Sequence, residues 1–138
     1  HSMAHKTGAA YSGGHIVHGC ANAMYLPKVI KYNSKNSEAA ERYAYIAKFI
    51  GLEGNTVDEL VDALINELKS MNKALEIPSC IKDYEGGIID EAEFNSKLKD
   101  VAALAISDAC TGSNPRQPSQ EEMEKLLTAC FYDKEIDF

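Results

Sequence analysis

The chain has 138 residues, of which 45% are hydrophobic and 25% charged, and its net charge is −7 at neutral pH. This length fits one domain that buries roughly two-thirds of its unfolded surface in a single core. The negative charge argues against nucleic acid as the main partner. The longest apolar run, Val101–Ile106, is far shorter than the ~20 residues of a membrane-spanning helix, so we expect no membrane segment.

Charge is distributed unevenly along the chain. Residues 1–50 contain six Lys or Arg and two Asp or Glu, a net charge of +4. Residues 51–138 contain eight Lys or Arg and nineteen Asp or Glu, a net charge of −11. Most of the acidic excess is expected on solvated helix faces.

The four cysteines predict the cellular compartment. They are Cys20, Cys80, Cys110 and Cys130, with neither a CxxC pair nor the spacing of a small disulfide framework. No basic segment followed by an apolar one marks a secretory signal. We therefore expect a cytoplasmic protein with reduced thiols.

The first half of the chain is predicted to be helical. Residues 1–35 carry almost no charge in their middle, which favours buried helix and connecting loop, with a kink at Pro27. Ser37–Ile50 has helical periodicity before a natural stop at Gly51, and its apolar positions are Ala40, Tyr43, Ala44, Ala47 and Ile50. Thr56 and Glu59 have capping-box spacing. They open a helix that ends by Ile77, with Leu60, Leu64, Leu68 and Met71 on one stripe.

The second half continues the helical pattern. Asp90 and Glu93 begin a helix that directs Phe94, Leu98, Val101 and Ala105 inward, and Ser119 and Glu122 begin a last one with Met123, Leu126, Leu127 and Cys130. No internal repeat and no run of alternating strand residues interrupts this pattern. The sequence therefore predicts an all-α, bundle-like single domain over residues 1–138.

One segment resembles part of a calcium-binding loop. In Lys82–Glu93, glycine and glutamate occupy the positions that the second half of an EF-hand loop requires. The first ligand positions are Lys82, Tyr84 and Gly86, which offer no carboxylate to the ion. We predict a Gly-Gly turn before a capped helix instead.

The histidines are confined to the start of the chain. His1, His5, His15 and His18 are the only four in the sequence. His1 and His5 are four residues apart and share one face if that segment is helical. Imidazole is a common ligand of iron and zinc, so this concentration predicts a metal or catalytic site. Composition alone does not choose the ligands.

Two motifs resemble those of a known enzyme family. The stretch HSMAHKTGAA followed by HGCANAMYLPKVIKYN is similar to the metal-binding signature of the iron-containing (group III) alcohol dehydrogenases. CTGSNPR, at Cys110–Arg116, resembles the C-terminal signature of that family. The similarity runs the length of the chain. SMAHK resembles the fused aldehyde–alcohol dehydrogenases, while the short ending is equally similar to the single-function members.

The resemblance implies roles for three histidines. His1 would be one metal ligand and His18 a second, whereas His5 would face substrate and nicotinamide as a catalytic group for proton relay or substrate positioning. The remaining ligands of this family, one Asp and one His, lie upstream of residues that correspond to this chain. The α/β domain that binds NAD(P) would also lie upstream, so we expect these 138 residues alone to be inactive.

The assignment of His18 depends on the alignment. Members of the family usually have a sequence near AAxxIPHG, whereas this chain has AAYSGGHIVHG, about three residues longer and without the proline. Spacing from His1 favours His15, and the following GCANA favours His18. We choose His18 and interpret Ser12–Gly14 as a loop insertion, with His15 as the alternative.

The resemblance implies an oxidoreductase that interconverts alcohols and aldehydes or ketones with NAD(P) and a divalent metal, Fe²⁺ or alternatively Zn²⁺. Small alcohols and aldehydes would be its substrates. Two other hypotheses come from different classes: a free-standing helical module that binds a metal or haem through the histidines, and a helical interaction domain. The sequence leaves open the physiological alcohol, the preference for NAD or NADP, the metal loaded and any homo-oligomer.

Overall fold

The computed structural model describes residues 1–8 and 10–138, and over these residues it contains helices and no strand. The α-helices are α1 (Ser2–Thr7), α2 (His18–Asn33), α3 (Ser37–Phe49), α4 (Val57–Ala74), α5 (Glu91–Ile106) and α6 (Gln120–Tyr132). Two 3-10 helices, η1 (Ile81–Gly86) and η2 (Thr111–Ser113), precede and follow α5. The predicted all-α class is confirmed. No helix among the described residues is long and apolar enough to cross a membrane.

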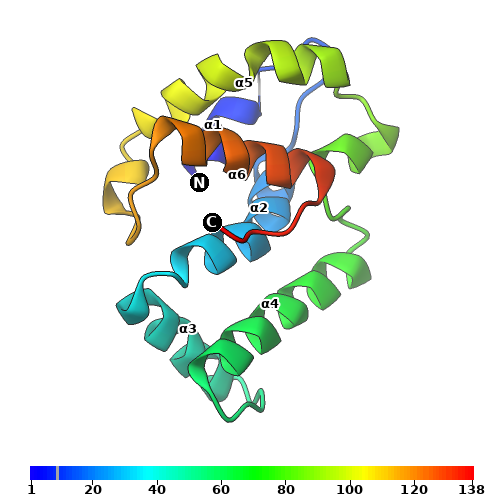
Figure 1. The fold of residues 1–138 in the computed structure, drawn as a ribbon. Helices are drawn as coiled ribbons and strands as arrows, with labels where there is room; N and C mark the ends of the chain where they lie inside the picture. Colours follow the sequence, from blue (N-terminus) through cyan, green and yellow to red (C-terminus); the bar gives the residue numbers. More distant parts are fainter. Residues whose placement is uncertain (9) are drawn as a thin grey trace.

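The helices enclose two neighbouring apolar clusters (Figure 1). The larger cluster lies among α1, α2, α5 and α6, where the Phe94 and Phe131 rings stack with their centroids 3.9 Å apart. The smaller cluster joins α3 and α4, which form a helical hairpin, to Ile30 of α2. Its members are Ile30, Ala40, Ala44, Ala47, Leu60, Val61, Leu64 and Ile65. The long helix α2 therefore contributes to both cores.

Capping interactions define the helix starts that the sequence predicts. The Asp90 carboxylate accepts the Glu93 N–H at 2.8 Å, and Ser119 forms a complete capping box with Glu122. Thr56 accepts the Glu59 N–H, as expected. The reciprocal bond differs, because the Glu59 carboxylate accepts from the N–H of Asn55 instead of that of Thr56.

Two predicted core positions are wrong. Met71 is 52% exposed and Ile50 is 50% exposed. At the Met71 turn, Asn72 faces α2 and its amide donates to the Ala23 carbonyl at 2.8 Å. Adjacent helical residues point about 100° apart, so Met71 is directed to solvent. Ile50 is the C-cap of α3, and Leu52 packs against the smaller cluster instead.

α2 runs without a break from His18 to Asn33 and includes Pro27. The helix therefore accommodates this proline without ending at it, in contrast to the interruption that proline often causes.

The Gly-Gly turn that precedes α5 is confirmed. Gly86 and Gly87 have φ values of +75° and +89°, in the left-handed region that glycine adopts without steric cost. Lys82, at the start of the segment that resembles a calcium loop, forms an ion pair with Glu91.

The predicted insertion at Ser12–Gly14 is fastened to α5 and to the turn before it. The Glu93 carboxylate accepts the Ser12 N–H at 2.9 and 3.0 Å and the Ser12 hydroxyl at 2.9 Å. A Cβ on Gly13 would lie 1.9 Å from the Ile88 carbonyl oxygen, so this close approach requires glycine. This loop leads directly to His18, whose position therefore depends on the fastening.

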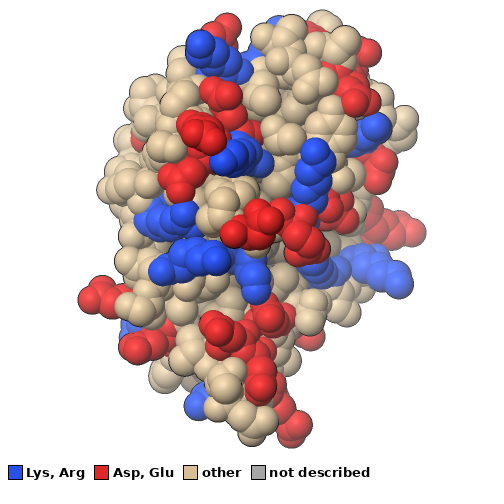
Figure 2. Space-filling model, in the orientation of Figure 1, with Lys and Arg blue, Asp and Glu red and all other residues tan. Residues whose placement is uncertain are grey.

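Ion pairs connect the basic first part of the chain with the acidic remainder. Lys6 pairs with Asp108, Lys28 with Asp133 and Lys31 with Asp62, at 3.0, 2.6 and 2.7 Å. On the face in Figure 2, basic and acidic side chains are interspersed. The charge asymmetry along the sequence therefore does not produce separate basic and acidic areas on this face of the folded protein.

Candidate metal and catalytic site

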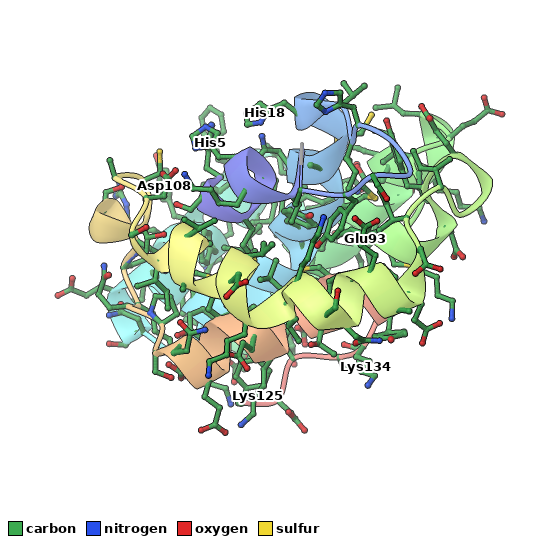
Figure 3. The ribbon with its side chains drawn as sticks, turned by 90° about the horizontal axis from the view of Figure 1, so that it is seen from above. His5, His18, Glu93, Asp108, Lys125 and Lys134 are labelled. Atoms are coloured by element: carbon green, nitrogen blue, oxygen red, sulfur yellow. The ribbon has the colours of Figure 1, made fainter. Side chains whose placement is uncertain are left out.

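Three of the four histidines converge on one exposed edge of the molecule. His1, His5 and His18 place their candidate ligand nitrogens within 4.8 Å of one another. Their ring centroids are 4.8 Å (His1–His5), 4.9 Å (His1–His18) and 5.3 Å (His5–His18) apart. Figure 3 shows His5 on α1 beside His18 at the start of α2. This arrangement gathers imidazoles from two segments separated by the loop.

The packing of α1 directs His1 and His5 outward. Met3, Ala4 and Thr7 are buried against α2 and α5, which leaves the opposite face of this short helix to the histidines. The Thr7 hydroxyl contacts the buried Tyr25 hydroxyl at 2.7 Å and donates to the Met3 carbonyl at 2.9 Å. Burial raises the pKa of Tyr25 well above its usual value, so this hydroxyl stays protonated.

His18 is held at the first turn of α2. The Asn22 side-chain nitrogen lies 2.9 Å from His18 Nε2 and 3.1 Å from the His18 carbonyl oxygen, to which it donates. Asn22 belongs to the GCANA segment, and sequence reasoning used it only for alignment. The His18 Nε2 atom lies 3.2 Å from His1 Nε2.

The separation of these two nitrogens fits a shared metal ion. With metal–nitrogen bonds of about 2.1 Å, two donors on a tetrahedral or octahedral ion lie about 3.0–3.4 Å apart. The distance of 3.2 Å falls in this range. The same distance also suits a hydrogen bond between two imidazoles. Two further observations favour a metal ion: imidazole nitrogens are common metal ligands, and the cluster is exposed, so an ion can reach it. The residues present fit a divalent ion with open positions for further ligands.

His15 lies apart from this cluster. Its Nδ1 contacts the Gly8 carbonyl oxygen, which also accepts the Ile16 N–H at 3.3 Å. His15 is thus part of the hydrogen bonding that closes the loop between α1 and α2. The structure brings His18, and not His15, to His1.

Asp108 is a site residue that sequence reasoning missed. Its Oδ2 lies 3.1 Å from His5 Nδ1 and 3.0 Å from Lys6 Nζ (Figure 3). Hydrogen bonds from the Cys110 N–H and the Lys6 ammonium hold the pKa of the Asp108 carboxyl well below its usual range. An ionised carboxylate only accepts hydrogen bonds, so the proton in this contact is on His5 Nδ1. In a neutral imidazole, Nε2 is then free to accept a proton.

The CTGSNPR motif brings Asp108 to α1. The Thr111 hydroxyl donates to Ser2 Oγ at 2.7 Å, and Ser2 Oγ donates to Asp108 Oδ1 at 3.3 Å. Asn114 exchanges amide hydrogen bonds with Asn33 at 2.8 and 2.9 Å. The motif therefore fixes the segment after α5 against both α1 and α2.

Arg116 fastens the end of the same motif. Its guanidinium donates to the Tyr32 and Phe138 carbonyls and to the Glu122 carboxylate, and it lies 3.8 Å from the centre of the Tyr32 ring. These contacts connect the motif to α2, α6 and the C-terminal segment. The motif is a structural clamp in this chain, and Asp108, two residues before it, is the group that reaches the histidines.

A cavity of about 240 Å³ lies beside His1. Its walls come from α1, α2, α3, the CTGSNPR segment and α6, and they include Tyr32, Tyr43, Cys110 and Met123. Apolar and polar groups both line it, which suits a small molecule with one polar end.

The all-helical fold, together with a cluster of imidazoles and an ionised carboxylate, defines a helical domain with a candidate metal site. The sequence profile of the Fe-containing alcohol dehydrogenase family, C-terminal part, matches residues 1–131. This chain belongs to that family.

Among its relatives, the NADPH-dependent butanol dehydrogenase of Clostridium saccharobutylicum is 56% identical over 138 residues, which are 100% of this chain and 34% of that protein. The aldehyde-alcohol dehydrogenase of Clostridium acetobutylicum is 39% identical over 95% of this chain and 16% of its own length. The chain thus spans about a third or less of these relatives.

Solved structures agree with the family. The iron-containing alcohol dehydrogenase from Thermococcus thioreducens superimposes with a TM-score of 0.77 at 29% identity, over 97% of this chain and 32% of that one. A 1,3-propanediol oxidoreductase superimposes with a TM-score of 0.79 at 27% identity, over 95% of this chain and 32% of its own. The predicted family and fold are confirmed.

Proposed function

We propose that this chain is the helical, metal-binding part of a longer NAD(P)-dependent alcohol dehydrogenase that interconverts small alcohols and aldehydes. The convergence of His1, His5 and His18 beside Asp108 is the observation that carries this proposal. The cavity next to His1 supports a small substrate. Family membership leaves no need for the alternative hypotheses of a free-standing metal or haem module or a helical interaction domain.

In this proposal, His1 and His18 hold a divalent ion, Fe²⁺ or alternatively Zn²⁺, through their Nε2 atoms. Such an ion supplies Lewis-acid polarisation of the substrate oxygen, and a nicotinamide supplies hydride chemistry. Asn22 donates to the His18 carbonyl at the first turn of α2, and its contact with His18 Nε2 would give way to the ion, because that nitrogen has a single lone pair. Both ligand histidines are exposed, so substrate and upstream residues can reach the ion from the same side.

His5 has a different role in the proposal, that of a catalytic proton carrier. Its Nδ1 is occupied by Asp108, which leaves Nε2 to accept the proton that a bound alcohol loses, or to return it to the product in the opposite direction. Asp108 fixes the tautomer and stabilises the imidazolium that forms when Nε2 is protonated. Hydrogen bonds from the Cys110 N–H and the Lys6 ammonium lower the pKa of the Asp108 carboxyl and so keep it ionised in both states.

We also place the protein in the cytoplasm, with its four cysteines as thiols. Cys20, Cys80, Cys110 and Cys130 are all unpaired in the described part of the chain, which supports a reducing compartment.

The test is turnover by the full-length protein that contains this chain. Because the relative at 56% identity is named a butanol dehydrogenase, butanal with NADPH and with NADH is the first assay. We expect nicotinamide oxidation that a chelator abolishes and that added Fe²⁺ or Zn²⁺ restores. Metal-independent turnover, or no turnover with any of a panel of short aldehydes and ketones, would contradict the proposal.

A further inference from the structure

We propose that the Cys110 thiol joins His5 and Asp108 in a second site for a thiophilic divalent cation such as Zn²⁺ or Cd²⁺. This site lies next to the pair formed by His1 and His18 and uses neither of these two residues. The candidate ligand atoms of His5, Asp108 and Cys110 lie within 4.8 Å of one another, and Cys110 is exposed. The three residues come from α1 and from the turn between α5 and η2, so the fold, and not a local sequence motif, assembles the group.

Two of the donors already have the spacing that one ion requires. His5 Nδ1 and Asp108 Oδ2 lie 3.1 Å apart, within the range of about 3.0–3.4 Å that bonds near 2.1 Å impose on neighbouring ligands. The zinc–sulfur bond is longer, about 2.3 Å, so the thiolate can sit farther from the other two donors. Rotation of the exposed Cys110 side chain about its Cα–Cβ bond supplies the remaining adjustment.

The backbone holds Cys110 beside the carboxylate. The Cys110 N–H donates to Asp108 Oδ1 at 3.0 Å, and the Thr111 N–H donates to the Asp108 carbonyl at 3.0 Å. This turn leaves the other carboxylate oxygen, Oδ2, facing His5 and Lys6. Metal binding therefore needs no rearrangement of the main chain.

The mixed nitrogen, oxygen and sulfur donors determine the class of ion. A thiolate together with an imidazole favours Zn²⁺ or Cd²⁺, whereas Mg²⁺ and Ca²⁺ prefer oxygen ligands. When the ion binds, the thiol loses its proton to solvent, and the neutral His5 ring changes tautomer, with its proton moving from Nδ1 to Nε2. One proton is therefore released in all, and binding is weaker at lower pH. His1 and His18 offer no sulfur, which distinguishes the two sites spectroscopically.

Lys6 competes for the same carboxylate oxygen. Its ammonium lies 3.0 Å from Asp108 Oδ2, and its side chain is 30% exposed, so it can move into solvent when a metal arrives. Displacing this charge reduces the affinity for the incoming cation. Replacing Lys6 by an uncharged side chain should therefore strengthen metal binding.

Occupation of the site inhibits the enzyme, because the ion replaces the hydrogen bond between His5 Nδ1 and Asp108 Oδ2 and leaves the ring proton on Nε2, the nitrogen that must accept a proton in the reaction. This consequence rests on the proposed function, whereas binding itself does not. The two are measured separately, so failure of one is distinguishable from failure of the other.

The experiment is a titration of the full-length protein with Cd²⁺, followed by the ultraviolet charge-transfer band of a cadmium–thiolate bond. Cys110→Ser should remove the band and weaken binding by ~10-fold or more, because a hydroxyl is a poor ligand for this ion. Lys6→Met should bind Cd²⁺ more tightly than the wild type. Cys20→Ser is the matched control, since Cys20 is outside the group, and it should retain the band.

His18→Ala should also retain the band, because His18 is a donor only in the first site. Persistence of the full band in Cys110→Ser, its loss in Cys20→Ser or His18→Ala, or unchanged affinity in Lys6→Met would overturn the proposal. Where turnover is measurable, Zn²⁺ added in excess of the amount that restores turnover should inhibit the wild type reversibly and Cys110→Ser at least ~10-fold less strongly. Equal inhibition of both proteins would contradict the claim that metal binding at this site inhibits the enzyme. It would not affect the conclusion on metal binding, which the cadmium titration decides.

Discussion

Asp108 determines which nitrogen of His5 is available for chemistry. Its carboxylate accepts from Nδ1 at 3.1 Å and is itself fixed by Lys6, Ser2 and the Cys110 N–H. An asparagine has nearly the same shape, but it can present its NH₂ group to Nδ1 and so favour the other tautomer.

Asp108→Asn in the full-length enzyme should lower kcat by ~10–100-fold, with little change in KM and with unchanged metal content. Asp108→Glu should recover part of the rate, because a carboxylate is restored. Asp62→Asn, which disrupts the exposed ion pair with Lys31, is the matched control and should leave kcat unchanged. Steady-state kinetics with metal analysis decides the matter, and loss of metal in Asp108→Asn would show that Asp108 supports the ligands instead.

The signal for Asp108 was too weak to find in the sequence. It lies 103 positions from His5, and one aspartate in a chain with 21 acidic residues carries no pattern. The histidines were found because they are scarce and concentrated. Which of them share a site depended on the loop, which places His18 next to His1 and His15 against Gly8.

The loop between α1 and α2 is an element whose shape depends on α5. Hydrogen bonds from the Lys97 ammonium and from the Ser12 N–H and hydroxyl lower the pKa of the Glu93 carboxyl. Such a group stabilises the fold above its unfolded pKa, near 4.5. This stabilisation is lost as the pH falls through the lower pKa of the folded state.

Glu93→Gln should therefore be less stable than the wild type at pH 7, and the difference should shrink as the pH falls below about 4.5. Urea unfolding of both proteins from pH 7 to pH 3 measures this. Glu121→Gln removes the partner of the exposed Lys125 and should behave like the wild type throughout. A Glu93→Gln deficit that is constant with pH would mean that the carboxylate charge does not fasten the loop.

The sequence predicted where helices begin better than it predicted which residues of the last helical turn are buried. Asp90, Thr56 and Ser119 cap helices as their spacing predicts, because a cap is a local interaction. Met71 keeps the helical period but faces solvent, because Asn72 is the residue of that turn that contacts α2, and Ile50 lies at the C-cap of α3. Periodicity does not indicate which side of a helix's last turn a partner helix covers, since tertiary packing sets this.

The whole molecule has two apolar clusters, and the candidate site belongs to only one of them. Leu64 is 5% exposed and lies in the smaller cluster, between α3 and α4. His1, His5 and His18 are on α1 and α2 at the other side of the fold (Figures 1 and 3). The α3–α4 hairpin should therefore open without loss of the histidine cluster.

Leu64→Ala should cost about 2–5 kcal/mol locally, since it leaves a cavity in the smaller cluster. We expect amide hydrogen exchange to accelerate in α3 and α4, with α5 and α6 remaining protected and with metal content unchanged. Leu104→Ala, at a leucine that is 54% exposed on α5, is the control and should change neither region. Uniform loss of protection in all helices would indicate one cooperative core instead of two.

The central claim is that His1 and His18 bind the metal and His5 does not, and metal analysis of purified full-length variants tests it directly. His1→Ala and His18→Ala should lose the ion, because each removes one of about four donors. His5→Ala should keep the ion and turn over ~10²–10⁴-fold more slowly. His15→Ala, a change at the histidine that lies apart from the cluster, should keep the metal. Loss of metal from His15→Ala with retention in His18→Ala, or loss from His5→Ala, would contradict the assignment.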